Sequence, residues 1–88
     1  MNFVLSQHAQ EEIYKRKIPL QIVHLILDYP EQIVEEDGLK VYQGIFTATN
    51  HKNYLLRIYV NDLVDPAKIV TLYMTSKINK YRSFSNES

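Results

Sequence analysis

The sequence predicts a single α+β domain in which two N-terminal helices pack on one face of an antiparallel four-stranded meander sheet, with a short helical turn at the C-terminal end. Three observations support this prediction. Helical spacing of apolar residues ends before residue 30, strand-forming residues fill positions 31–75, and the connections between the strands are short. A chain of 88 residues buries one core, so we expect one domain over residues 1–82 and a polar tail over 83–88.

Two helices are expected before residue 30. Residues 3–5 form a short strand or a lead-in, and Ser6 is the N-cap expected for a helix that ends at about Lys17. Pro19 suits the first turn of a second helix, because its missing N–H would have no partner there. The pair Tyr29-Pro30 then ends that helix.

The four expected strands follow in order. Strands over residues 32–36 and 39–47 flank Asp37-Gly38, a dipeptide that favours a tight hairpin in which both central residues take positive φ. A polar loop over 48–52 and a proline-containing turn over 62–67 separate strands over 53–61 and 68–75. Ser76 is then the expected cap of a helical turn that reaches Tyr81.

Side chains alternate across a strand, which sorts the expected sheet into two faces. The expected core face carries Leu39, Val41, Ile45, Leu56, Ile58, Val60, Val70, Leu72 and Met74. The opposite face is expected to carry Lys40, Tyr42, Gly44, Phe46, Arg57, Tyr59, Thr71, Tyr73 and Thr75. Aromatic rings that stack on bases and a guanidinium that binds phosphate suit single-stranded RNA, although tyrosine and threonine are also ordinary residues of a half-exposed strand.

Composition excludes several classes of function. The chain has no cysteine, so it forms no disulfide, no thiolate nucleophile and no cysteine-ligated metal site. Its apolar runs are far shorter than the ~20 residues of a membrane helix, and its first residues do not read as a signal peptide. We therefore expect a cytoplasmic protein without a membrane partner. We expect no cofactor and no metal, because glycine-rich phosphate loops are absent and the pair His8 and Glu12 lacks further ligands.

The zero net charge conceals an uneven distribution. Residues 1–38 hold seven acidic and three basic side chains, whereas residues 39–88 hold three acidic and seven basic side chains. A locally basic surface attracts phosphate even on a neutral protein. The opposite charges of the two halves are equally explained by their attraction for each other in the fold.

One ordered set of motifs runs from about Val4 to Tyr81. It comprises Ser6-x-His8-Ala9, Arg16-x-Ile18-Pro19, Pro30-Glu31-Gln32-Ile33, Lys40-Val41-Tyr42, Leu55-Leu56-Arg57 and Thr71-x-Tyr73-x-Thr75-Ser76-Lys77-Ile78-x-Lys80-Tyr81. In this order the motifs resemble the bacterial domain-of-unknown-function 4258 family. That family is distantly similar to the RelE and BrnT type toxins, small ribonucleases of toxin–antitoxin pairs, so the resemblance implies a RelE-like fold, RNA or a ribosome as target, and an antitoxin partner. The family commonly has a second basic residue on the first helix, where this chain has Glu11 and Glu12.

Metal-free RNA cleavage needs a base for the 2'-hydroxyl, positive donors for the phosphorane and an acid for the leaving oxygen. The candidate catalytic residues are Arg57, Lys77, Tyr81 and His8. The candidate substrate-binding residues are Tyr42, Tyr73, Thr75, Ser76 and Lys80.

The candidates also have ordinary structural explanations. Arg57 is either a phosphate clamp or the partner of an acidic first-half residue such as Glu35. His8 is either a general base or a residue that bonds locally or packs against the sheet. Lys77 and Lys80, three positions apart, either face one phosphate together or belong to a solvated chain end.

Two functions therefore remain open. The first is a toxin-like RNA-interacting protein, with metal-independent endoribonuclease activity on free RNA or on the ribosome. The second is a non-catalytic interaction module that binds a protein partner, or a second copy of the chain, through a sheet edge or through the aromatic sheet face.

Overall fold

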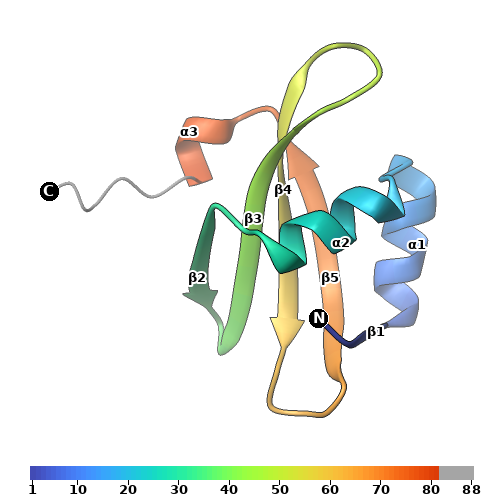
Figure 1. Cartoon of the computed structure of the whole chain (residues 1–88), viewed down its shortest axis with the longest axis vertical. Helices are drawn as coiled ribbons and strands as arrows, with labels where there is room; N and C mark the ends of the chain where they lie inside the picture. The colour runs from blue at the N-terminus through green and yellow to red at the C-terminus, as the bar shows by residue number, and fades with distance from the viewer. Residues whose placement is uncertain (82–88) are drawn as a thin grey trace, which may run out of the picture.

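A five-stranded mixed sheet forms the centre of the structure, a computed structural model that describes residues 1–81. The strands lie in the order β1-β5-β4-β3-β2, and the first two helices lie on one side of them (Figure 1). The elements are β1 (Phe3–Leu5), α1 (Gln7–Arg16), α2 (Leu20–Asp28), β2 (Gln32–Glu36), β3 (Leu39–Thr47), β4 (Asn53–Asn61), β5 (Ala67–Thr75) and α3 (Ile78–Tyr81).

The α+β class and the two N-terminal helices are confirmed, but the sheet is not the predicted four-stranded antiparallel meander. Residues 3–5 form a fifth strand, β1, which pairs in parallel with β5. Ser6 continues this contact, because its N–H donates to Ile69 O at 3.0 Å and its hydroxyl donates to Val70 O at 2.7 Å. The pairing joins segments more than sixty residues apart, so the local pattern of a three-residue strand contains no sign of it.

The predicted cap of α1 and the predicted hairpin turn are present, whereas Pro19 lies at the N-cap of α2 in an extended conformation (ψ 128°) and not in the first turn of that helix. Ser6 Oγ accepts a hydrogen bond from Ala9 N at 2.9 Å and thereby caps α1. Lys17 ends α1 in the left-handed region, at φ 56°. Asp37 and Gly38 both have positive φ, 52° and 78°, as the tight turn between β2 and β3 requires.

The core lies between the helices and one face of the sheet, here called the first face. Ala9 of α1 packs there together with Val23, Ile26 and Leu27 of α2. The sheet contributes Phe46, Leu56, Ile58, Val60, Ile69 and Leu72. A Cβ atom built on Gly44 would lie 3.2 Å from Ile26 Cγ1, so the missing side chain lets α2 approach β3 closely.

The predicted assignment of β3 to the two faces is wrong. Tyr42 lies opposite Ile58 and Gly44 opposite Leu56, so the even-numbered residues of β3 face the helices. Leu39, Val41 and Ile45 therefore lie on the opposite face, here called the second face. Alternation yields two sets of residues for each strand, and the cross-strand register decides which set meets the core.

A β-bulge between β4 and β5 also makes the predicted face wrong for one position of β5. The register between β4 and β5 shifts between Tyr59 and Val60, where Val60 pairs with Ile69. Ile69 consequently takes the place in the core that was predicted for Val70. A bulge inserts one extra residue into a strand, so the simple alternation fails on one side of it.

Three further expectations concern the cap before α3, the C-terminal tail and membrane-spanning helices. The hydroxyl of Thr75, rather than that of Ser76, accepts from Lys77 N at 3.0 Å just before α3. The expected polar tail over 83–88 lies outside the described residues. Within residues 1–81, every helix is too short or too polar to cross a membrane.

Candidate functional site

Arg57 is the centre of the second face. It comes from the middle of β4, between two strands, and only 2% of it is exposed. Its neighbours Leu56 and Ile58 point into the core on the first face, so alternation directs Arg57 to the other side. A buried charged side chain of this kind requires partners for its donors.

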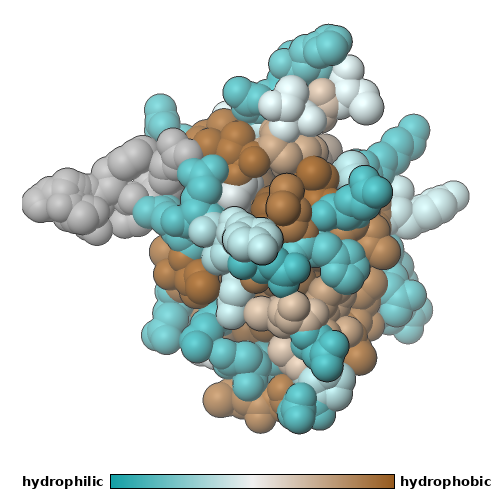
Figure 2. Space-filling view, viewed as in Figure 1, coloured by the Kyte–Doolittle hydropathy of each residue, from teal (hydrophilic) through white to brown (hydrophobic). Residues whose placement is uncertain are grey.

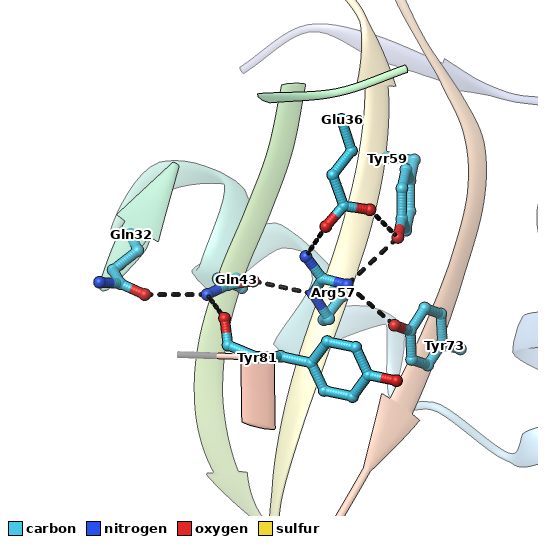
Figure 3. A network of polar contacts seen from close by, with 7 residues as sticks. All are labelled: Gln32, Glu36, Gln43, Arg57, Tyr59, Tyr73 and Tyr81. Carbon is cyan, nitrogen blue, oxygen red and sulfur yellow. Dashed lines mark hydrogen bonds and ion pairs between the residues drawn. The ribbon is translucent and has the colours of Figure 1, made fainter. Parts of the chain in front are cut away.

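Four strands, including β4 itself, supply these partners (Figure 3). Arg57 Nε donates to Gln43 Oε1 of β3 at 2.8 Å. Nη1 donates to the hydroxyls of Tyr73 at 2.9 Å and Tyr59 at 3.2 Å, and Nη2 donates to Glu36 Oε2 of β2 at 2.6 Å. Charge-assisted hydrogen bonds on all three nitrogens hold the guanidinium in one orientation.

Aromatic rings surround the same guanidinium. Its Cζ lies 4.7 Å from the ring centre of Tyr81, on α3, and 5.6 Å and 5.8 Å from those of Tyr59 and Tyr73. The ring of Tyr73 stacks on that of Tyr59 and meets that of Tyr81 edge-on. We call Glu36, Gln43, Arg57, Tyr59, Tyr73 and Tyr81 the arginine cluster.

Gln43 connects the arginine cluster to two other elements. Its side chain is buried, with 1% of the residue exposed. While its Oε1 accepts from Arg57, its Nε2 donates to Gln32 Oε1 at 2.9 Å and to Tyr81 O at 3.2 Å. The amide of Gln43 therefore holds β2 and α3 against the centre of the sheet.

The charges and hydrogen bonds of the arginine cluster shift several pKa values. The hydrogen bonds from Arg57 and Tyr59 lower the pKa of Glu36, which stays ionised. Burial and the neighbouring Glu36 carboxylate raise the pKa of Tyr59. The pKa of Tyr81 is lowered by a hydrogen bond with Tyr73 and by Lys80, whose Nζ lies 5.2 Å from the Tyr81 ring centre.

The arrangement contains the three kinds of group that metal-free RNA cleavage needs. Glu36 is an ionised carboxylate whose side chain is 40% exposed, so solvent and ligands reach it. Arg57 is the cation, and Tyr81 is a hydroxyl whose pKa is lowered. Among residues 1–81, no group of three or more His, Cys, Asp or Glu side chains is placed to hold a metal ion.

Most candidates from the C-terminal half lie at or beside this cluster. Tyr73 and Tyr81 are members of it, and Lys80 is beside Tyr81. Thr75 follows Tyr73 on the second face and bonds the backbone of Lys77. Ser76 and Lys77 are exposed in the connection between β5 and α3.

Two candidates lie elsewhere. Tyr42 is on the first face and packs against the core, so its predicted position beside Arg57 is wrong for the same reason as the rest of β3. His8 is exposed on α1, the helix whose Ala9 packs into the core of the first face. Since Arg57 is on the second face, the sheet separates His8 from the arginine cluster.

The sequence pattern missed Glu36 and Gln43 as members of the site. A salt bridge from Arg57 to an acidic first-half residue was one of the two expected explanations, and the partner is Glu36 rather than Glu35. Glu35 lies opposite Lys40 and points to the other face. The hairpin at Asp37-Gly38 sets this register, so the turn was the one local signal that linked Glu36 to the odd-numbered residues of β3.

Comparisons of the chain with protein-family models, with curated proteins and with solved structures found no match.

Proposed function

We propose that this domain is a toxin-like RNA-interacting protein that cleaves RNA without a metal, and that the arginine cluster is its reactive site. One observation carries the proposal: an ionised carboxylate, a guanidinium and a hydroxyl of lowered pKa meet on the second face. Titratable groups whose pKa values are shifted and which lie together mark functional sites more often than chance does. The resemblance to the domain-of-unknown-function 4258 family and to the RelE and BrnT type toxins points to the same class.

The chemistry divides among three residues. The Glu36 carboxylate accepts the proton of the attacking 2'-hydroxyl, because it is ionised and partly exposed. Arg57 stabilises the charge of the phosphorane: four of its five N–H groups have partners in residues 1–81, and the fifth is available to a phosphate oxygen. The hydroxyl of Tyr81 donates a proton to the leaving 5'-oxygen.

Access to Arg57 requires a movement of α3. The Tyr81 ring covers the guanidinium, and the hydrogen bond from Gln43 Nε2 to Tyr81 O holds the helix in place. Because α3 has four residues and follows the exposed residues Ser76 and Lys77, few contacts oppose a shift that admits a phosphate oxygen to the guanidinium while the Tyr81 hydroxyl stays beside it.

The exposed lysines beside the cluster account for attraction of the RNA backbone. Lys77 and Lys80 are three positions apart, both are exposed, and Lys80 lies next to the Tyr81 ring. Lysines that neutralise phosphates make binding dependent on salt. Bases of a single strand would stack on the tyrosine rings, as aromatic platforms allow without strong sequence preference.

The test is 5'-end mapping of total RNA after incubation with the purified full chain, with and without translating ribosomes. Glu36→Gln keeps the shape of the side chain and an oxygen that accepts from Arg57, but it removes the base, so we expect cleavage to fall by about 100-fold or more. Glu35→Gln makes the same change one residue away on the other face and should cleave normally. Cleavage that survives Glu36→Gln, or RNA that stays intact with the unmodified protein in both conditions, would contradict the proposal.

Binding is tested separately from cleavage. The variant Lys77→Ala/Lys80→Ala should bind a single-stranded RNA more weakly, and two lost phosphate contacts should make the slope of log affinity against log salt shallower by about 1.4. Lys15→Ala/Lys17→Gly is the control, since it removes the same charge at the end of α1 and glycine suits the positive φ at position 17. Equal salt slopes for the two variants would exclude the lysines of α3 and of its connection to β5 as the RNA contact.

A further inference from the structure

A cavity of about 240 Å³ lies between the start of α2 and the β3–β4 loop, residues 48–52. Its apolar lining comprises Pro19, Ile22, Phe46, Ala48 and Met74. All of these except Pro19 belong to the core or pack against it, so the floor of the cavity is held in place by the fold. In the orientation of Figure 1, hydrophobic surface lies between this loop and α2 (Figure 2). Small-molecule sites are concave and mainly apolar in this way, with a few polar groups that orient the ligand.

The volume of the cavity limits its occupant to one ring with a short arm. A cavity of about 150 Å³ accommodates benzene. The additional volume here allows two or three further atoms beside the ring. Phe46 and Met74 suit an aromatic ring, because an aromatic side chain and a thioether both make favourable contacts with one.

The rim of the cavity is polar. Lys17, Gln21, Thr47 and Thr49 complete the lining, and all four residues are exposed. The hydroxyl of Thr47 donates to Asn53 Oδ1 at 2.7 Å. The side chains of Gln21 and Thr49 have no hydrogen-bond partner among residues 1–81, so an amide N–H and a hydroxyl are available to a ligand.

Lys17 supplies a positive charge to this rim. The fold fixes its backbone, because its N–H donates to Tyr14 O at 3.3 Å and the next residue, Ile18, is 4% exposed. Its neighbour Arg16 is paired with Glu12 at 2.6 Å. Within the described part of the chain, by contrast, Lys17 has no carboxylate at ion-pair distance. A ligand anion would therefore meet a cation that is not already paired.

The sequence around the cavity contains no competing negative charge. Residues 13–27, 38–61 and 66–81 contribute every residue of the lining, and none of these stretches contains aspartate or glutamate. An anion at the rim is consequently not repelled by the segments that form the cavity. A cationic ligand would find no partner there and would be repelled by Lys17.

We infer that this cavity binds a small aromatic carboxylate. The ring lies against Phe46 and Met74, and the carboxylate accepts hydrogen bonds from Lys17, Gln21 and Thr49. This inference goes beyond the proposed function, because Phe46 and Met74 belong to the first face, whereas the arginine cluster is on the second face.

The probe is 3-phenylpropionate, added to the isotope-labelled full chain and followed by amide chemical shifts. We expect saturable shifts concentrated in residues 17–22 and 46–49. The amide of the same acid, 3-phenylpropionamide, has nearly the same shape without the charge and should bind at least about fivefold more weakly. The amine 3-phenylpropylamine should not bind, since Lys17 repels it.

Two substitutions and a matched control test the two parts of the cavity. Lys17→Asn removes the charge, and asparagine tolerates the positive φ of 56° at this position, so binding of 3-phenylpropionate should weaken at least about fivefold. Lys15→Asn removes an equal charge outside the lining and should leave binding unchanged. Ala48→Leu keeps the charge but fills the cavity, and should abolish binding. Amide spectra of the three variants verify that they fold.

Several results would overturn the inference. Absence of shifts at about 10 mM 3-phenylpropionate, or shifts confined to residues outside the lining, would exclude the cavity as the site. Equal binding of the acid and the amide, or unchanged affinity in Lys17→Asn, would show that the charge does not select the ligand. Unchanged binding in Ala48→Leu would show that the ring does not enter the cavity. These measurements involve no RNA, so their failure is distinguishable from a failure of the proposed function.

Discussion

Replacing Arg57 with methionine tests whether the arginine cluster stabilises the fold. Methionine keeps an unbranched apolar stem but removes four hydrogen bonds. Gln43, 1% exposed, loses the donor to its Oε1, and such an orphaned buried atom costs about 1–3 kcal/mol. Removing one partner of a buried ion pair costs about 3–5 kcal/mol, less here because the Glu36 side chain is 40% exposed. We expect a total loss of about 3 kcal/mol.

Urea unfolding measures this loss. A small domain has a denaturant slope of about 1 kcal/mol per molar urea, so the midpoint should fall by about 3 M. The variant Gln43→Leu/Arg57→Met adds a second test, because it removes both polar partners at once. Its loss should be smaller than the sum of the two single losses by about 1 kcal/mol or more.

Two results would refute this reasoning. A loss below about 1 kcal/mol for Arg57→Met would mean that the hydrogen bonds of the arginine cluster merely replace those made with water. Strict additivity of the Arg57 and Gln43 substitutions would mean that the two side chains do not depend on each other. The first outcome would leave Arg57 without a structural role and would increase the weight of a functional one, whereas the second would mean that Arg57 and Gln43 stabilise the fold independently.

The remaining predictions concern the N-cap of α1, the close contact between Gly44 and Ile26, and the titration of Glu36. Ser6→Ala should cost about 1–2 kcal/mol in urea unfolding, because the hydroxyl caps α1 and also donates to β5. Gly44→Val should cost about 1–3 kcal/mol, since even a Cβ would lie 3.2 Å from Ile26, and a cost near zero would mean that α2 moves freely. The fold lowers the pKa of Glu36, so the ionised carboxylate stabilises the fold fully at pH values above its ordinary pKa of 4.5. This stabilisation is lost as the pH falls from 4.5 through the lowered pKa. Melting temperatures against pH should therefore have a shallower acid limb in Glu36→Gln than in Glu35→Gln; parallel limbs would contradict the shift.

Stability and catalysis make different demands on the arginine cluster. The four hydrogen bonds of Arg57 and the tyrosine rings around it support the fold, whereas a phosphate reaches the remaining N–H of Arg57 only when the covering Tyr81 ring shifts. Glu36→Gln removes the base together with the charge of the ion pair and the oxygen that accepts from the Tyr59 hydroxyl, but it keeps one oxygen that accepts from Arg57, so its loss of stability is measured beside its loss of cleavage. A variant that keeps most of the stability but loses cleavage would assign the carboxylate to chemistry.

Local signals in the sequence were sufficient for the elements that depend on neighbouring residues. The Ser6 cap needs only the backbone of Ala9, and the turn at Asp37-Gly38 needs only two residues that tolerate positive φ. The two helices and the strands from β2 to β5 follow from such contacts together with the spacing of apolar residues. The acidic partner of Arg57 was foreseen as a class, although not as Glu36.

Contacts between distant segments decided the rest. β1 became a strand only because β5 offers it an edge, and Tyr42 faced the core because β3 meets β4 in one register and not in its neighbour. The same register moved Gln43 beside Arg57 and made it a member of the site. His8 was separated from Arg57 by the sheet for an equally global reason, since α1 packs on the first face.

After residue 5, the sequence by itself determined which segments are helices and strands, where the first helix and the hairpin have their ends, and that an arginine lies in the middle of a strand between aliphatic residues. Only the tertiary structure decided which face each residue of β3 occupies, and hence which side chains surround that arginine. The physical reason is that successive side chains of a strand point to opposite faces of the sheet, so either set of alternate residues could face the core. Pairing with β4, and the room that Gly44 leaves for Ile26 of α2, make one of the two faces the core.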